Sequence, residues 1–393
     1  MIGRPRSSAV RIGGMVLAAA MLVAAGGATS ASAASKTSKI PFLLGEAYPL
    51  TGSEGAYGVG LKDTEAIAVS YINQRGGILG HPIKVTVWDT QAEPAVGIAA
   101  TQAFIGAHVN AVEGYFDSSV TIPSIPLLEQ ANIPLFGGNP STPALATMHL
   151  KNFVRITGND RNEGTVQAAF VRQKLGLSTA VVIDDNETFG DAFAAAFASK
   201  FKALGGTIAA RYTTTIDTTD FTSVLAQVQT VQPQIVEYSG FDPAAALLLK
   251  QMRADGITAK YVTDSSQYGS VFTSTAGATA AVGAYMTNVH SQINSPLYKY
   301  LQTQMQKRYH QAVTSIDANG FDAIIAIWKT AELAHSIAPA KLIAYMHRTT
   351  FQGATGKVSF LPDGDRAQIS YTVIQVTPSL TYQTVYTYAK TLS

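Results

Sequence analysis

Strand-like and helix-like segments alternate along almost the whole chain after about residue 40, and this alternation most constrains the fold. Residues 42–44 and 83–88 read as strands, whereas 193–204 carry apolar side chains at helical spacing and end at a glycine. Such alternation is typical of α/β layers built on parallel sheets. We therefore predict an α/β protein, and the 393 residues leave room for two domains of ~150 residues each.

The first 34 residues predict a secretory signal. Three arginines precede an apolar run over residues 15–25, which is too short to span a bilayer. Residues 31–33 fit the small-x-small rule for cleavage. We expect residues 1–34 to be a cleaved signal peptide, and the rest to be soluble and secreted or periplasmic.

Cysteine content and charge exclude several classes of protein. The chain has no cysteine, which excludes disulfides, Cys-based metal sites and a lipid-anchoring cysteine after the signal. Of the 28 basic residues, three lie in the signal, and the remaining 25 face 26 acidic residues for a net charge of −1. A near-neutral chain argues against nucleic acid as a partner, because that binding depends on basic patches.

No catalytic or cofactor motif stands out. The chain has no phosphate loop, no Gly-x-Gly-x-x-Gly after a strand, no His-Glu-x-x-His and no Gly-x-Ser-x-Gly. Its seven histidines are scattered without metal-ligand spacing. Asp363 and Asp365 flank Gly364, which is typical of a hairpin turn rather than of a calcium loop. We predict binding rather than turnover, with no catalytic residues, metal or cofactor.

Hydroxyl-rich loops follow two consecutive predicted strands. The strand at 110–112 leads to Asp117 and Ser118 at a helix start, and the strand at 133–136 leads to the polar loop 137–142. A helix start has unpaired N–H groups and partial positive charge, so it suits a carboxylate, phosphate or amide oxygen. Ligands of open α/β sheets bind outside the carboxyl ends of strands, so these loops predict half of a small-molecule pocket. For any one hydroxyl, helix capping alone is the alternative.

The order of such loops resembles the type I periplasmic solute-binding proteins, most closely the branched-chain amino acid (leucine/isoleucine/valine) binding branch. The resemblance covers nearly all of the mature chain and rests on these stretches in order: 49–52 with 57–58, 72–80, 89–94, 114–121, 133–143, 185–190, 240–243 and 321–323. It implies two Rossmann-like, doubly wound lobes joined by a three-strand hinge, with the ligand between them. Lobe 1 would be 39–157 plus 289–366, and lobe 2 would be 158–288 plus 367–393.

The resemblance also implies which residues contact the ligand. Ser118 and Ser141 match the hydroxyl-bearing positions that hold a ligand carboxylate in lobe 1, and Asn139 would offer its backbone and its side-chain amide. The aromatic residues that cover the ligand in this family match three positions here, Tyr57, Phe189 and Phe241. For each aromatic residue, packing in the core is the alternative.

One position departs from the family pattern. The amino-acid binders carry a glutamate in lobe 2 that pairs with the ligand ammonium, and the matching position here is Ser265, with Asp264 beside it. Asp117 also stands where the family is usually uncharged. A buried ammonium needs an anionic partner. Asp264 or Asp117 would supply it, unless the ligand lacks an ammonium.

These features together predict an extracytoplasmic substrate-binding protein of an ABC importer, not an enzyme, whose two lobes close on one small solute. The expected ligand is a branched-chain or other apolar amino acid. The alternatives are a ligand that is an amide or an aromatic or other organic acid, and a ligand-sensing role for a membrane receptor. A secreted hydrolase would need a nucleophile and a base that no spacing supports. We expect a monomer without a lipid anchor, with permease subunits as partners.

Overall fold

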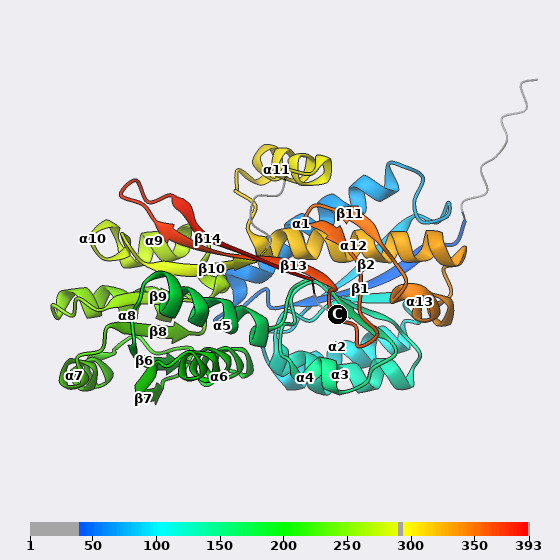
Figure 1. Ribbon diagram of the computed structural model, residues 1–393. Coiled ribbons are helices and arrows are strands. Elements are labelled where there is room, and N and C mark those ends of the chain that lie inside the picture. Colours follow the sequence, from blue (N-terminus) through cyan, green and yellow to red (C-terminus); the bar gives the residue numbers. More distant parts are fainter. Residues whose placement is uncertain (1–38, 290–293, 392–393) are drawn as a thin grey trace, which may run out of the picture. The chain divides into compact units, whose positions relative to one another are not determined.

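Two β-sheets with helices packed on them organise this computed structural model, which describes residues 39–289 and 294–391 (Figure 1). The predicted signal peptide lies outside these residues. The chain from Lys39 onward forms one compact unit. Within the described ranges, no helix has both the length and the apolar stretch that crossing a bilayer requires.

The first sheet is entirely parallel and has the strand order β2-β1-β3-β4-β5. Its central strands are short apolar runs that are buried on both faces, as is usual when helices cover both sides of a parallel sheet. The strands are β1 (Phe42–Tyr48), β2 (Ile83–Asp89), β3 (Ala111–Gly114), β4 (Leu135–Gly137) and β5 (Phe153–Arg155).

Helices cover both faces of the first sheet. One core joins the sheet to α1, α11, α12 and α13, and Figure 1 shows α1 and α12 side by side. A second core joins the other face to α2, α3 and α4. The elements are α1 (Gly55–Asn73), α2 (Pro94–Gly106), α3 (Ser118–Gln130), α4 (Ala144–Thr147), α11 (Pro296–Tyr309), α12 (Ser315–Ala334), α13 (Pro339–Met346) and the hairpin β11 (Phe351–Gly353) with β12 (Gly356–Val358).

The second sheet is mixed and has the order β14-β13-β10-β9-β8-β6-β7. Its strands from β10 to β7 are parallel, whereas β13 and β14 add an antiparallel pair at one edge. The strands are β6 (Thr179–Asp184), β7 (Thr207–Thr213), β8 (Ile235–Ser239), β9 (Lys260–Thr263), β10 (Tyr285–Val289), β13 (Gln368–Val376) and β14 (Tyr382–Thr391).

Helices also cover both faces of the second sheet. The core with α5 and α6 lies on one face, and the core with α7, α8, α9 and α10 lies on the other. The elements are α5 (Asp160–Ala169), which continues as the π-helix Phe170–Lys174, α6 (Thr188–Ala203), α7 (Thr222–Val231), α8 (Ala244–Ala254), the 3₁₀ turn Ser265–Gln267, α9 (Ser270–Ala276) and α10 (Ala278–Ala281).

The chain passes between the two sets of layers three times. It crosses after β5, returns after β10 to build α11 to α13, and crosses again before β13. Parallel sheets with helices on both faces confirm the predicted α/β class. The residue boundaries of the two lobes stay a prediction. In each sheet the strand order reverses beside one strand, β1 in the first and β6 in the second, which is where α/β sheets bind ligands.

Candidate functional site

A single pocket gathers the carboxyl ends of strands from both sheets. Its volume is about 50 Å³, room for a few waters and so for a small solute only. From the side of the first sheet it is lined by Phe116, Asp117, Ser118, Asn139, Ser141, Thr157, Ser315, Ile316 and Asn319. From the side of the second sheet it is lined by Glu163, Phe189, Phe241, Ser265, Ser266 and Val289.

Most of the residues that the sequence singled out meet at this pocket. They are Asp117, Ser118, Asn139, Ser141, Phe189 and Phe241. Tyr57 and Asp264 do not line it. Tyr57 packs behind Phe116 with a ring-centroid distance of 5.3 Å, and Asp264 is fully buried in the loop after β9. Their predicted contact with the ligand is therefore not part of this geometry.

Helix α3 begins at the pocket with Ser118. Asp117 has the extended backbone of an N-cap residue, but its side chain makes no capping hydrogen bond. The Ser118 hydroxyl accepts a hydrogen bond from the Thr142 N–H at 3.3 Å. Because Ser118 accepts there, its own hydroxyl proton is left to donate, and the start of α3 adds partial positive charge. This end of the pocket is suited to a ligand oxygen.

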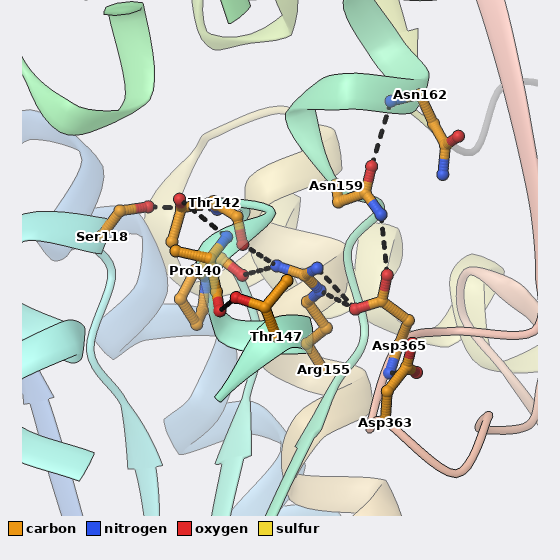
Figure 2. A network of polar contacts seen from close by, with 10 residues as sticks. Ser118, Pro140, Thr142, Thr147, Arg155, Asn159, Asn162, Asp363 and Asp365 are labelled. Carbon is orange, nitrogen blue, oxygen red and sulfur yellow. Dashed lines mark hydrogen bonds and ion pairs between the residues drawn. The ribbon is translucent and has the colours of Figure 1, made fainter. Parts of the chain in front are cut away.

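The loop after β4 carries Asn139 and Ser141, and Arg155 holds this loop through hydrogen bonds to its backbone (Figure 2). The guanidinium donates from Nη1 to the carbonyl oxygens of Pro140 and Thr142, at 3.2 and 2.8 Å. Its Nε and Nη2 contact Oδ1 of Asp365 at 2.7 and 2.5 Å. Because Arg155 has no exposed surface and Asp365 is only 5% exposed, this ion pair fixes the loop from inside the protein.

Asn139 is tied to the start of α12. Its Oδ1 accepts from Nδ2 of Asn319 at 3.0 Å, and its Nδ2 donates to the Ile316 carbonyl at 3.3 Å. No hydrogen bond joins its backbone N–H to another residue in the described part of the chain. The side-chain amide is thus occupied, and the backbone N–H is the group that can meet a ligand.

Three aromatic rings, Phe116, Phe189 and Phe241, line the pocket, and Tyr57 packs behind them. Phe241 lies 5.2 Å from Phe189, 5.9 Å from Phe116 and 5.7 Å from Tyr57, measured between ring centroids. The Tyr57 hydroxyl donates to the Ser266 carbonyl at 3.3 Å and accepts from the Asp242 N–H at 3.2 Å. Rings from both sheets' layers thus form one apolar wall beside the polar start of α3.

Asp117 is an acidic group at the polar end. Its carboxyl is 5% exposed, and Oδ2 has no hydrogen-bond partner among the described residues. Burial raises the pKa of Asp117, and contact with the buried Glu54 carboxyl acts against that rise. Burial and the neighbouring Asp117 raise the pKa of Glu54 well above its ordinary value. The two buried carboxyls therefore shift each other's pKa, and the charged form of Glu54 is the one that the pair disfavours.

Glu163 is the second acidic group of the pocket, and the sequence reasoning missed it. It lies in the first turn of α5 and is 4% exposed. Its Oε1 accepts from the Ser265 N–H at 3.0 Å and from the Thr287 hydroxyl at 2.5 Å. Burial raises its pKa, and these hydrogen bonds oppose the rise. The signal that could have found it is Asn159, an N-cap residue followed by acidic residues in the first turn.

Asp264 holds its own loop together. Its Oδ2 accepts from the Gly240 N–H at 2.9 Å, and its Oδ1 accepts from the Ser266 N–H at 2.8 Å and the Ser266 hydroxyl at 2.6 Å. Both oxygens are therefore used within the protein, which gives Asp264 a structural role. Among the residues that the structure describes, no group of three or more His, Asp or Glu side chains could hold a metal ion.

Comparison with known proteins agrees with this geometry. The family model described as periplasmic binding protein matches residues 41–380. The leucine-, isoleucine-, valine-, threonine- and alanine-binding protein of Pseudomonas aeruginosa is 24% identical over 359 residues, which are 91% of this chain and 94% of that protein.

Two solved structures share the fold. A branched-chain amino acid transporter substrate-binding protein of Streptococcus pneumoniae, in complex with isoleucine, has a TM-score of 0.80 at 22% identity, over 89% of this chain and 99% of its own. An ABC transporter solute-binding protein of R. palustris, in complex with benzoate, has a TM-score of 0.82 at 17% identity, over 90% and 98%. With the family model matching most of its length, this chain belongs to the periplasmic binding protein family and has the type I fold of that family.

Proposed function

We propose that this protein is the substrate-binding component of an ABC importer and that its pocket takes one small apolar amino acid, with a branched-chain amino acid as the first candidate. The family supports the binding role, and the P. aeruginosa relative is named for leucine, isoleucine and valine among its ligands. The pocket's hydrogen-bonding end and aromatic end support this class of ligand.

The observation that carries this proposal is that the start of α3 and the aromatic wall line the same small pocket. An amino acid would place its carboxylate at the Ser118 hydroxyl and the Asn139 N–H, where donors and the helix dipole favour negative charge. Its apolar side chain would lie against Phe189 and Phe241, which would contribute affinity by removing apolar surface from water.

The wider role follows the same proposal. The ligand is held between lobes 39–157 plus 289–366 and 158–288 plus 367–393, which close around it and present it to permease subunits. The protein is exported by the signal over residues 1–34. It acts as a monomer without a lipid anchor, and it performs no catalysis.

One observation favours a second candidate, a small amide. Asp117 lies beside Ser118 at the polar end of the pocket, where an ionised carboxylate would repel a ligand carboxylate. An amide would instead offer an N–H donor to Asp117 and an oxygen to Ser118. Raised pKa values for Asp117 and Glu54 keep the amino acid as the first candidate, because burial disfavours the charged forms that would repel a ligand carboxylate.

Thermal stabilisation of the mature protein by a ligand panel tests the proposal. The panel holds leucine, isoleucine and valine, their des-amino acids, and the matching amides. Ligand at ~1,000 times its dissociation constant stabilises the bound form by about 4 kcal/mol, which raises the melting temperature by several degrees. We expect the branched-chain amino acids to give the largest shift. A shift for amides alone would establish the second candidate, and a flat panel would contradict both.

A further inference from the structure

We infer that Glu163 is the anionic partner of a positively charged nitrogen on the ligand, and that this pocket selects ligands carrying such a nitrogen. The inference rests on the proposed function only in taking this pocket as the ligand site. It adds a residue that selects the ligand, and it names the chemical feature of the ligand that this residue recognises.

The geometry leaves one oxygen of Glu163 for the ligand. The hydrogen bonds from the Ser265 N–H and the Thr287 hydroxyl both end on Oε1, and the Ser265 hydroxyl also interacts with the carboxyl and favours its charged form. No hydrogen bond from the described residues ends on Oε2 at a recorded distance. Oε2 is also absent from the fully buried polar atoms without a partner, so it keeps some exposed surface. Since Glu163 lines the pocket, Oε2 is the atom that faces a bound molecule. The donors on Oε1 fix the direction of the carboxylate before a ligand arrives.

The charges around Glu163 call for a cation. Among the described residues that line the pocket there is no lysine, arginine or histidine. The charge of Glu163 raises the pKa values of three neighbouring groups that are themselves acids, namely Asp160, Asp264 and Tyr371. A buried carboxylate without a counter-ion is costly, and a ligand cation that brings the missing charge gains most of that energy back. A ligand without a cation cannot supply this missing charge.

Asp117 is the other carboxyl that could take this role, and its surroundings differ. It interacts with a second buried carboxyl, Glu54, and the two shift each other's pKa. Glu163 instead receives neutral donors only. Asp117 also lies beside Ser118, at the end suited to ligand oxygens. A ligand nitrogen at Glu163 and a ligand oxygen at Ser118 would use one polar group from the layers of each sheet.

Titration calorimetry on the wild type and Glu163→Gln, with three ligands of one skeleton, tests the inference. The ligands are leucine, 4-methylpentanoate, which lacks the ammonium, and 3-methylbutylamine, which lacks the carboxylate. Gln keeps an oxygen acceptor for Ser265 and Thr287 but removes the charge. We expect Glu163→Gln to weaken leucine about 100-fold, as loss of a buried charge pair does, and to change the affinity for 4-methylpentanoate less than about threefold.

Two variants separate this role from its alternatives. Asp264→Asn changes a buried carboxyl of the same region that does not line the pocket, so it should alter the affinities for leucine and 4-methylpentanoate by one common factor. Asp117→Asn should not reproduce the selective loss. If Glu163→Gln weakens both ligands equally, or if only Asp117→Asn is selective for the ammonium, the inference is overturned. If Glu163→Gln does not fold, Thr287→Val replaces it, and it should weaken leucine more than the acid.

The wild type separates failure of the inference from failure of the proposed function. If the wild type binds 3-methylbutylamine but not leucine, the amino acid proposal is contradicted and the role of Glu163 as partner of a ligand cation is supported. If the wild type binds 4-methylpentanoate as tightly as leucine, the inferred role of Glu163 is overturned. The protein would then be a binding protein for small organic acids. Leucine binding that survives unchanged in Glu163→Gln would leave the proposed function in place without this residue.

Discussion

Ser118 and Ser141 approach the pocket from two different loops. Ser118 is the first residue of α3, and its hydroxyl also accepts the Thr142 N–H from the next loop. Ser141 lies in that next loop, and its carbonyl accepts the Asp160 N–H at 3.1 Å. Each hydroxyl therefore stands on backbone that other segments hold in place, so its removal should affect a ligand more than the fold.

Replacing both hydroxyls measures their share in binding. Because hydrogen bonds to a charged group contribute about 1.5–3 kcal/mol each, the double variant Ser118→Ala with Ser141→Ala should weaken leucine by at least about 100-fold. Calorimetric titration gives the affinity, and a thermal melt checks the fold. Ser223→Ala, on an exposed position of α7, is the matched control and should bind as the wild type does. Unchanged affinity in the double variant would contradict the placement of the ligand oxygen.

At this scale the sequence predicted much of the pocket because its signals are local. Ser118 and Asn139 directly follow strands, and strand ends carry ligands in α/β sheets. Glu163 was missed because its role depends on Thr287 and Ser265, which lie more than 100 residues away in the chain. Asp264 was assigned to the ligand because its charge was visible in the sequence, whereas the N–H groups that occupy it were not.

Helix α3 shows how packing overrides a local signal. Pro123 and Pro126 predict that this helix starts late or is kinked, because proline lacks an N–H and crowds the preceding turn. The structure places both prolines inside a helix that already begins at Ser118, so the late start is wrong. Val120 and Leu128 pack into the core beneath the first sheet, and burial of this face outweighs the lost hydrogen bonds.

The loop after β4 depends on β5 through Arg155. In Figure 2 this side chain contacts the loop on one side and Asp365 on the other. Asp365 also accepts from the Asn159 Nδ2 at 2.7 Å, just before α5. One buried ion pair therefore links the pocket loop, the end of β5 and the segment that precedes β13.

Removing the guanidinium tests this link. Arg155→Met should lower the free energy of unfolding by about 3–5 kcal/mol, because it leaves the Asp365 carboxylate buried without a counter-ion. Denaturant unfolding measures the loss. Lys329→Met is the control, since its ion pair with Glu332 is about one-third exposed and should change stability by at most about 1 kcal/mol. Equal effects for the two variants would contradict the structural role of Arg155.

Across the whole molecule, buried carboxyls lie on the strands of both sheets. Burial raises the pKa of Glu46 on β1 to about 7, and that of Glu113 on β3 and Glu237 on β8 to about 8. In the unfolded chain a glutamate has a pKa of about 4.3. Between these values the folded protein holds protons that the unfolded chain has lost. The stability that these protonated carboxyls contribute is therefore fully present below the pKa of the unfolded chain. It is lost as the pH rises through the pKa values of the folded protein.

We expect the free energy of unfolding to fall between about pH 5 and pH 8. Glu113→Gln should make this fall shallower by up to about 1.4 kcal/mol per pH unit, because it removes one of the groups that must lose a proton. Denaturant unfolding at several pH values measures the slope, and Glu129→Gln, at a partly buried position of α3, should leave it unchanged. A stability that rises toward pH 8 in the wild type would contradict the prediction.

The order in which the chain is made has a consequence for the pocket. Helix α12, which packs on the first sheet and carries three residues of the pocket, comes late in the chain. The last two strands of the second sheet, β13 and β14, come later still. Neither half is therefore complete until most of the chain has been translated. A chain that stops before α12 lacks Ser315, Ile316 and Asn319, so only a chain translated beyond this point carries every residue that lines the pocket.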